Sequence, residues 1–177
     1  FVSRIALLAA CLGLFAAPAH AAAYGSFNQA YARNVITPAF KKAAVETAKL
    51  AQAADDFAGA PSQDGFAALR VAFDSVSEAW MHAEMFRTGP LEQEQRDQRF
   101  LYWPERRNIV DKQLSALLAA PDPKALTPAQ FVHATVAVQG LPALERLLYG
   151  DNARQILSAG PEQKARASIV SDTTTPI

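Results

Sequence analysis

The sequence predicts an all-α protein, folded as an up-down helical bundle. Alanine is abundant and runs of β-branched residues are few, which favours helix by intrinsic propensity. Apolar residues recur at spacings of three and four, and glycine and proline divide the chain into segments joined by short loops. Four long amphipathic segments with short connections are typical of such a bundle.

The N-terminal residues have the pattern of a secretory signal peptide, which we place at residues 1–21. Arg4 precedes an apolar run from Ile5 to Ala17, and Ala19-His20-Ala21 offers small residues to a signal peptidase. The run is too short to cross a bilayer as a helix, so we expect no transmembrane segment in the mature chain. We therefore expect a protein exported to the periplasm or to an outer-membrane-associated part of the cell envelope. Because the chain begins with Phe1, we also expect its natural start to lie further upstream.

Cys11 is the one cysteine of the chain, and it lies inside this leader. The residues that end at Cys11 resemble a lipoprotein cleavage box, which is the alternative to cleavage near Ala21. Ordinary cleavage leaves no disulfide, thiolate ligand or cysteine nucleophile. Of the 17 basic residues Arg4 is lost, so 16 remain against 17 acidic ones, a net charge of −1. This balance gives no attraction toward nucleic acid or anionic lipid.

Two long helices are predicted in the first half of the mature chain. The first covers about residues 27–58 and stops at Gly59-Ala60-Pro61. Ser62 is the expected N-cap of the second helix, which ends near Arg87. An apolar stripe on this second helix is expected to form core, and it consists of Phe66, Leu69, Phe73, Val76, Trp80 and Ala83.

Two further helices are predicted in the second half. Residues 91–100 are polar and are expected to form a surface connection. Trp103-Pro104 is expected to start a third helix, because proline suits the first helical turn. Thr127-Pro128 repeats this start, and the fourth helix runs from there to Gln139. His133 lies in a nearly apolar part of that helix, where a buried histidine with a backbone or hydroxyl partner is expected.

The remaining residues set the expected end of the domain. Gly140-Leu141-Pro142 breaks the helical pattern, and a short helical piece follows from Pro142 to Tyr149. The prediction is thus four main helices with a break near Gly140–Pro142, in one domain of residues 22–158. We expect residues 159–177 to form a weakly helical to disordered tail of an incomplete chain.

Three motifs occur in the order found in a known family. The segment Ala137–Gly150 resembles the central motif of the imelysin-like family, G-x-H-x-x-E followed by an apolar pair, an aromatic residue and often glycine. Glu84-Met85-Phe86-Arg87 matches the E-x-F-R of that family, and Trp103-Pro104 before a Leu-rich stretch also fits. The resemblance covers roughly residues 27–157, and it implies the first of two related helical halves.

The resemblance implies an envelope protein linked to iron supply, in a family first described as metallopeptidases. A His-x-x-Glu pair lies on one helix face and can reach one ion. Here Pro142, which cannot ligate, stands at the histidine position, while Gly140 and Glu145 match the motif. The first hypothesis is therefore binding or uptake of a metal, iron or zinc, without catalysis. The alternatives are a metallopeptidase and a metal-free helical module that uses a polar pocket for another ligand or an envelope protein partner.

Glu145, Glu84 and His82 are the candidate metal ligands. The alternatives for Glu145 are a binding-site carboxylate and an acidic residue in the first turns of a helix, where it complements the helix dipole. Glu84 and Arg87 either line a polar pocket of the bundle together or form an ordinary ion pair with each other, three residues apart. His82 follows Glu78 by four residues, a spacing that suits either a chelating pair or a solvated one.

Overall fold

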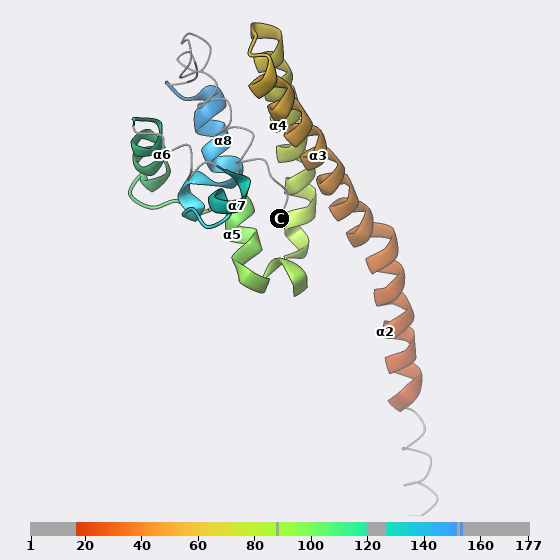
Figure 1. The fold of residues 1–177 in the computed structure, drawn as a ribbon. Helices are drawn as coiled ribbons and strands as arrows, with labels where there is room; N and C mark the ends of the chain where they lie inside the picture. Colours follow the sequence, from red (N-terminus) through yellow and green to blue (C-terminus); the bar gives the residue numbers. More distant parts are fainter. Residues whose placement is uncertain (1–16, 88, 120–126, 152, 154–177) are drawn as a thin grey trace, which may run out of the picture. The chain divides into compact units, whose positions relative to one another are not determined.

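The computed structural model describes residues 17–87, 89–119, 127–151 and 153, and every regular element in those residues is a helix (Figure 1). The all-α class and the helical bundle are therefore confirmed. The chain divides into two units, residues 1–39 and 40–177, which we describe separately. Residues 1–16 of the predicted signal peptide and the predicted tail 159–177 lie outside the described residues.

The first unit is helical from Ala17 onward. Helix α2 (Ala17–Tyr31) leads into a π-helical turn, η1 (Ala32–Ile36), which is followed by the first residues of α3 (Thr37–Gly59). Within α2 the rings of Phe27 and Tyr31 stack with centroids 6.1 Å apart. Across all the residues that the structure describes, we find no helix with the length and apolar character that a bilayer crossing requires.

The second unit begins with two antiparallel helices, α3 from residue 40 onward and α4 (Gln63–Ala83). Lys42 Nζ lies 3.5 Å from Glu78 Oε1 at one end, and the rings of Phe57 and Phe66 lie 5.7 Å apart at the other. Ser62 Oγ accepts a hydrogen bond from the Gly65 amide at 3.0 Å, which confirms the predicted N-cap. The predicted apolar stripe of α4 is also confirmed, because all six of its residues are buried.

Helix α8 (Gly140–Tyr149) is the central element of the second unit. It contacts α4, α5 (Arg96–Phe100) and α6 (Ile109–Ala119), and Figure 1 shows it between α4 and α6. Its buried residues are Leu141, Ala143, Leu144, Leu147 and Leu148. A fully buried leucine contributes about 2 kcal/mol, so this short helix adds much of the core.

The predicted fourth helix, Thr127–Gln139, is wrong in its extent. The structure has a single turn, α7 (Pro128–Phe131), and a 3-10 turn, η5 (Val136–Val138). The side-chain amide of Gln139 donates to the carbonyls of Phe131 and Ala134 at 3.0 and 2.7 Å, so a side chain satisfies the acceptors that a continued helix would use. His133 lies in the turn after α7 and is exposed, so the expectation of a buried histidine is also wrong.

The third helix begins five residues later than predicted. It starts at Ile109, because Arg107 and Asn108 adopt left-handed backbone angles with φ of 61° and 52°. Glu105 Oε1 accepts a hydrogen bond from the Val110 amide at 2.9 Å and so satisfies the first turn of α6. The residues after Trp103-Pro104 are consequently an irregular segment before the helix.

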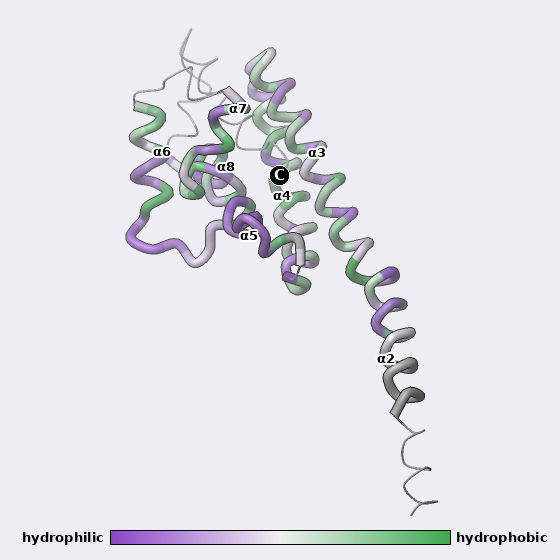
Figure 2. Tube along the Cα trace, turned by 60° about the horizontal axis from the view of Figure 1, so that its bottom comes forward, coloured by the Kyte–Doolittle hydropathy of each residue, from purple (hydrophilic) through white to green (hydrophobic). Residues whose placement is uncertain are grey.

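The predicted surface connection at residues 91–100 is largely helical. After the 3-10 turn η2 (Glu84–Phe86), the chain forms η3 (Gly89–Leu91), η4 (Gln93–Gln95) and then α5. Helix α5 is hydrophilic over most of its length (Figure 2), yet it ends at Phe100, whose ring packs on Trp80 with centroids 4.3 Å apart. One aromatic contact therefore attaches a polar helix to α4.

Candidate functional site

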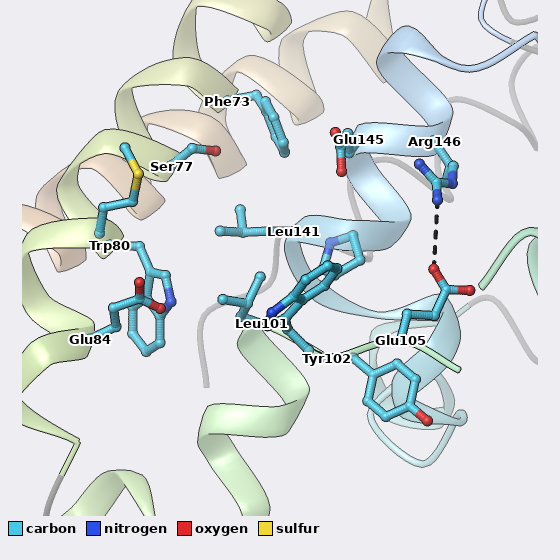
Figure 3. A pocket seen from close by; sticks show the side chains of 13 residues that line it. Phe73, Ser77, Trp80, Glu84, Leu101, Tyr102, Glu105, Leu141, Glu145 and Arg146 are labelled. Atoms are coloured by element: carbon cyan, nitrogen blue, oxygen red, sulfur yellow. Dashed lines mark ion pairs between the residues drawn. The ribbon is translucent and has the colours of Figure 1, made fainter. Parts of the chain in front are cut away.

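An open pocket of about 320 Å³ lies in the second unit, among the C-terminal part of α4, the irregular segment 101–105 and the first turns of α8 (Figure 3). It is lined by aromatic, aliphatic and acidic side chains. They are Phe73, Ser77, Trp80, Met81, Glu84, Leu101, Tyr102, Trp103, Glu105, Leu141, Pro142, Glu145 and Arg146. Each is within the second unit, so the pocket belongs to one compact body.

Gly140 fixes the position of the α8 side of this pocket. Its φ is 69°, a left-handed conformation that glycine adopts without strain. A β-carbon at residue 140 would overlap the backbone carbonyls of Arg99 and Phe100, at the end of α5. The start of α8 therefore lies directly against α5, and this contact places Leu141, Pro142 and Glu145 at the pocket.

An ion-pair network centred on Arg146 of α8 holds the irregular segment 101–105 against this helix. Arg146 Nη2 lies 3.6 Å from Glu105 Oε2, and its Nε lies 2.7 Å from Asp111 Oδ1 on α6 (Figure 3 shows the Glu105 pair). Glu105 also accepts from the Val110 amide, so this one carboxylate joins the irregular segment to both α6 and α8. The positive charge of Arg146 is thus already shared between two carboxylates.

Two of the three candidate ligands line the pocket. Glu84 begins η2 directly after α4 and is half-buried, while Glu145 lies on α8 and is exposed. Figure 3 shows their carboxylates on either side of Leu101 and Leu141. Neither side chain has a hydrogen bond or ion pair with any residue that the structure describes. The pocket therefore carries two acidic groups whose charge is not compensated there.

Arg87 does not form the ion pair that its spacing from Glu84 allows. Its Nη2 instead donates to Asp97 Oδ2 at 2.6 Å, which ties the residue after η2 to the first turn of α5. The Arg87 hydrogen bond lowers the pKa of the Asp97 carboxyl, and partial burial opposes this shift without cancelling it. Glu84 therefore lines the pocket without an ion pair to Arg87, and Arg87 itself is not among the lining residues.

His82 is not in the pocket. It is exposed in the last turn of α4, and Glu78, its partner in the chelating interpretation, pairs with Lys42. Within the described ranges, no group of three or more His, Cys, Asp or Glu side chains is arranged to hold a metal ion. Pro142 stands at the motif's histidine position, and metal ligation by Glu145, Glu84 and His82 stays a prediction.

The aromatic side of the pocket was not predicted from the sequence. Tyr102 and Trp103 line it because the third helix does not start at Pro104, and Trp103 is 67% exposed at the rim. Trp80 was predicted as core and is 5% exposed, but its Nε1 has no hydrogen-bond acceptor among the described residues. The signal that was available is the Trp103-Pro104 motif itself, which we assigned to a helix start.

The fold and this site define a helical-bundle protein of a known class. The model of the Imelysin peptidase family matches residues 36–174. The chain therefore belongs to the imelysin family.

Comparison with solved structures gives the same assignment. The chain is similar to an imelysin-like protein from Psychrobacter arcticum 273-4, with 27% sequence identity and a TM-score of 0.70. The similarity covers 84% of this chain and 45% of that protein, so this chain spans less than half of the solved relative. No curated protein sequence matches the chain.

Proposed function

We propose that this chain is an exported imelysin-family protein of the periplasm or envelope, and that it binds a ligand in the pocket between α4 and α8 without catalysis there. The observation that carries the proposal is the pair of carboxylates, Glu84 and Glu145, which line one pocket and have no partner among the described residues. Acidic groups that the fold leaves uncompensated are available to a ligand of opposite charge.

Catalysis is disfavoured by the chemistry of the lining side chains. Peptide hydrolysis at a metal requires about three protein ligands and an activated water. The residues that line the pocket include no histidine, and Pro142 replaces the one that would pair with Glu145. Ser77 lines the pocket without a histidine base beside it, so nucleophilic catalysis by the Ser–His arrangement is also disfavoured.

Metal handling is the second candidate, and one observation favours it. Carboxylate oxygens are ligands that iron accepts, and two of them line this pocket. The described residues do not complete a ligand set, so this candidate requires donors from elsewhere in the protein. A low affinity of this chain for iron and zinc is therefore expected.

A fragment screen with a matched blocking variant tests binding in the pocket. Ligand-observed NMR is recorded on the purified chain with a mixture of cationic, neutral and anionic small molecules. Ser77→Trp fills the pocket with an indole, and Ser75→Trp places the same side chain two residues away, outside the lining set. We expect the NMR binding signal of these molecules to disappear with Ser77→Trp and to remain with Ser75→Trp. Equal binding by both variants, or peptide cleavage that Glu145→Gln abolishes, would contradict the proposal.

Export is tested separately by sequencing the N-terminus of the protein from a periplasmic extract. The expected first residue is Ala22, directly after Ala19-His20-Ala21. A lipid-modified chain that begins at Cys11 would show a lipoprotein, and uncut protein in the cytoplasm would contradict export.

A further inference from the structure

We infer that the pocket selects an organic ammonium: a small molecule with a positively charged amine, an apolar body and a hydrogen-bond acceptor. This inference names the ligand class of the same pocket, and so it rests on the proposed function. Four features of the pocket lead to it, namely its uncompensated charge, its aromatic walls, its size and an indole N–H that has no acceptor in the described part of the chain.

The charge of the pocket favours a cation. Among the lining residues, three carboxylates face one guanidinium. Arg146 pairs with Glu105 at 3.6 Å and is shared with Asp111 at 2.7 Å, so it does not neutralise Glu84 or Glu145. An anion would meet two uncompensated negative charges, whereas an ammonium group gains from both of them.

The walls of the pocket favour an organic cation over a hydrated ion. Four aromatic side chains line it, and an ammonium group is attracted to the face of such a ring, most strongly to tryptophan. They are Phe73, Trp80, Tyr102 and Trp103. Trp103 and Met81 are 67% and 59% exposed at the rim, so a ligand with an apolar body removes apolar surface from water there.

Trp80 adds an independent indication that a ligand binds. Its side chain is buried, and its Nε1 is enclosed and has no acceptor among the described residues. Figure 3 shows the indole nitrogen on the side of the ring that faces Leu101 and the other lining residues. Most buried indole N–H groups have a hydrogen-bond partner. A hydroxyl or carbonyl oxygen of a bound molecule would supply it after a small shift of the ring.

Size and geometry separate this ligand from a bare metal ion. A volume of about 320 Å³ lies in the range of sites for small organic molecules. A metal ion needs several donors that converge on one point, and the described residues contain no such group. Two separated carboxylates with aromatic rings beside them instead fit an organic molecule that carries an ammonium group.

Three probes of equal length test the inference by isothermal titration calorimetry on the purified chain. Aminohexanol is a cation, hexanediol is neutral and hydroxyhexanoate is an anion, and each carries a hydroxyl group. We expect aminohexanol to bind at least about tenfold more tightly than hexanediol, and hydroxyhexanoate not to bind. Glu84→Gln and Glu145→Gln should each lower the affinity for aminohexanol about fivefold. Glu92 is an exposed glutamate outside the pocket, so Glu92→Gln should leave this affinity unchanged. Added salt should lower the affinity for aminohexanol and leave the affinity for hexanediol unchanged.

The outcomes distinguish the ligand class from the proposed function. If aminohexanol and hexanediol bind equally, unaffected by the two glutamine variants but weakened by Ser77→Trp, the pocket binds ligands and the ammonium class is wrong. If zinc or iron binds tightly and displaces aminohexanol, metal handling replaces the ammonium class. If no probe binds at concentrations up to about 10 mM, both the ligand class and the proposed binding function are contradicted.

Discussion

Gly140 lies against the carbonyl group of Phe100, so closely that residue 140 has no room for a β-carbon. This contact joins the end of α5 to the start of α8, and the left-handed φ of 69° at Gly140 turns the chain into the helix that carries Pro142 and Glu145. The first glycine of the family motif therefore has a structural reason that does not depend on a ligand.

Gly140→Ala should destabilise the chain by at least about 3 kcal/mol, or prevent folding, because it adds a steric overlap to a left-handed backbone. Urea denaturation followed by circular dichroism measures the loss. Gly59→Ala is the matched control, since a β-carbon there meets nothing within 4 Å, and it should change stability by less than about 1 kcal/mol. Equal effects of the two variants would show that the Gly140 contact is not required.

Arg70 connects α4 to the C-terminal end of α8. Its Nε and Nη2 donate to the Leu148 carbonyl at 3.0 and 2.6 Å, and its guanidinium lies 4.7 and 4.9 Å from the ring centroids of Phe66 and Tyr149. Arg70→Met keeps an aliphatic stem of similar length but removes these interactions. It should lower the free energy of unfolding by about 2 kcal/mol. Lys49→Met, at an exposed ion pair, should cost less than about 0.5 kcal/mol in the same urea titration.

The Arg87–Asp97 pair predicts a pH dependence of stability. Because the pKa of Asp97 is lower in the folded chain than in the unfolded one, its contribution is fully present above the ordinary aspartate value. It is lost as the pH falls through the lower, folded value. Asp97→Asn should therefore lose less stability than the natural chain between about pH 7 and pH 3. Asp151→Asn, at an exposed residue, serves as the control, and parallel curves for Asp97→Asn and the natural chain would contradict the assignment.

The metal hypothesis is tested at the position where this chain departs from the family motif. Pro142→His would place histidine three residues before Glu145 on one face of α8. We expect the natural chain to bind zinc or iron weakly and substoichiometrically, and Pro142→His to raise the affinity at least about tenfold. Pro142→His with Glu145→Ala corrects for adventitious binding. Tight binding of one metal ion by the natural chain, abolished by Glu145→Ala, would contradict our assignment.

The sequence predicted the helices whose apolar stripes and caps are local. Ser62, the stripe of α4 and the imelysin resemblance were identified correctly, because N-cap chemistry and helical periodicity are written in neighbouring residues. The prediction of the fourth helix was wrong, because the side chain of Gln139 satisfies the carbonyls of Phe131 and Ala134, eight and five residues earlier. Helical periodicity does not register such a side-chain contact.

The candidate site was predicted in part, for a related reason. Glu84 and Glu145 were selected from motifs, and the structure places both in one pocket. Tyr102 and Trp103 were missed, because Trp103-Pro104 is compatible with a helix start until the left-handed residues that follow are known. Glu84 and Glu145 are 61 positions apart in the sequence, so a pocket that contains both depends on tertiary packing, which periodicity does not encode.

The two tryptophans of the chain both line the pocket, so their indole N–H signals report on it directly. The most direct test is therefore a titration of the ¹⁵N-labelled chain with aminohexanol, followed by its two indole N–H resonances and assigned with Trp103→Phe. We predict that both resonances shift on binding, that the Trp80 signal moves downfield as its N–H gains an acceptor, and that Glu84→Gln with Glu145→Gln removes both shifts. Unchanged indole resonances in the presence of bound aminohexanol would place the ligand elsewhere and contradict the account.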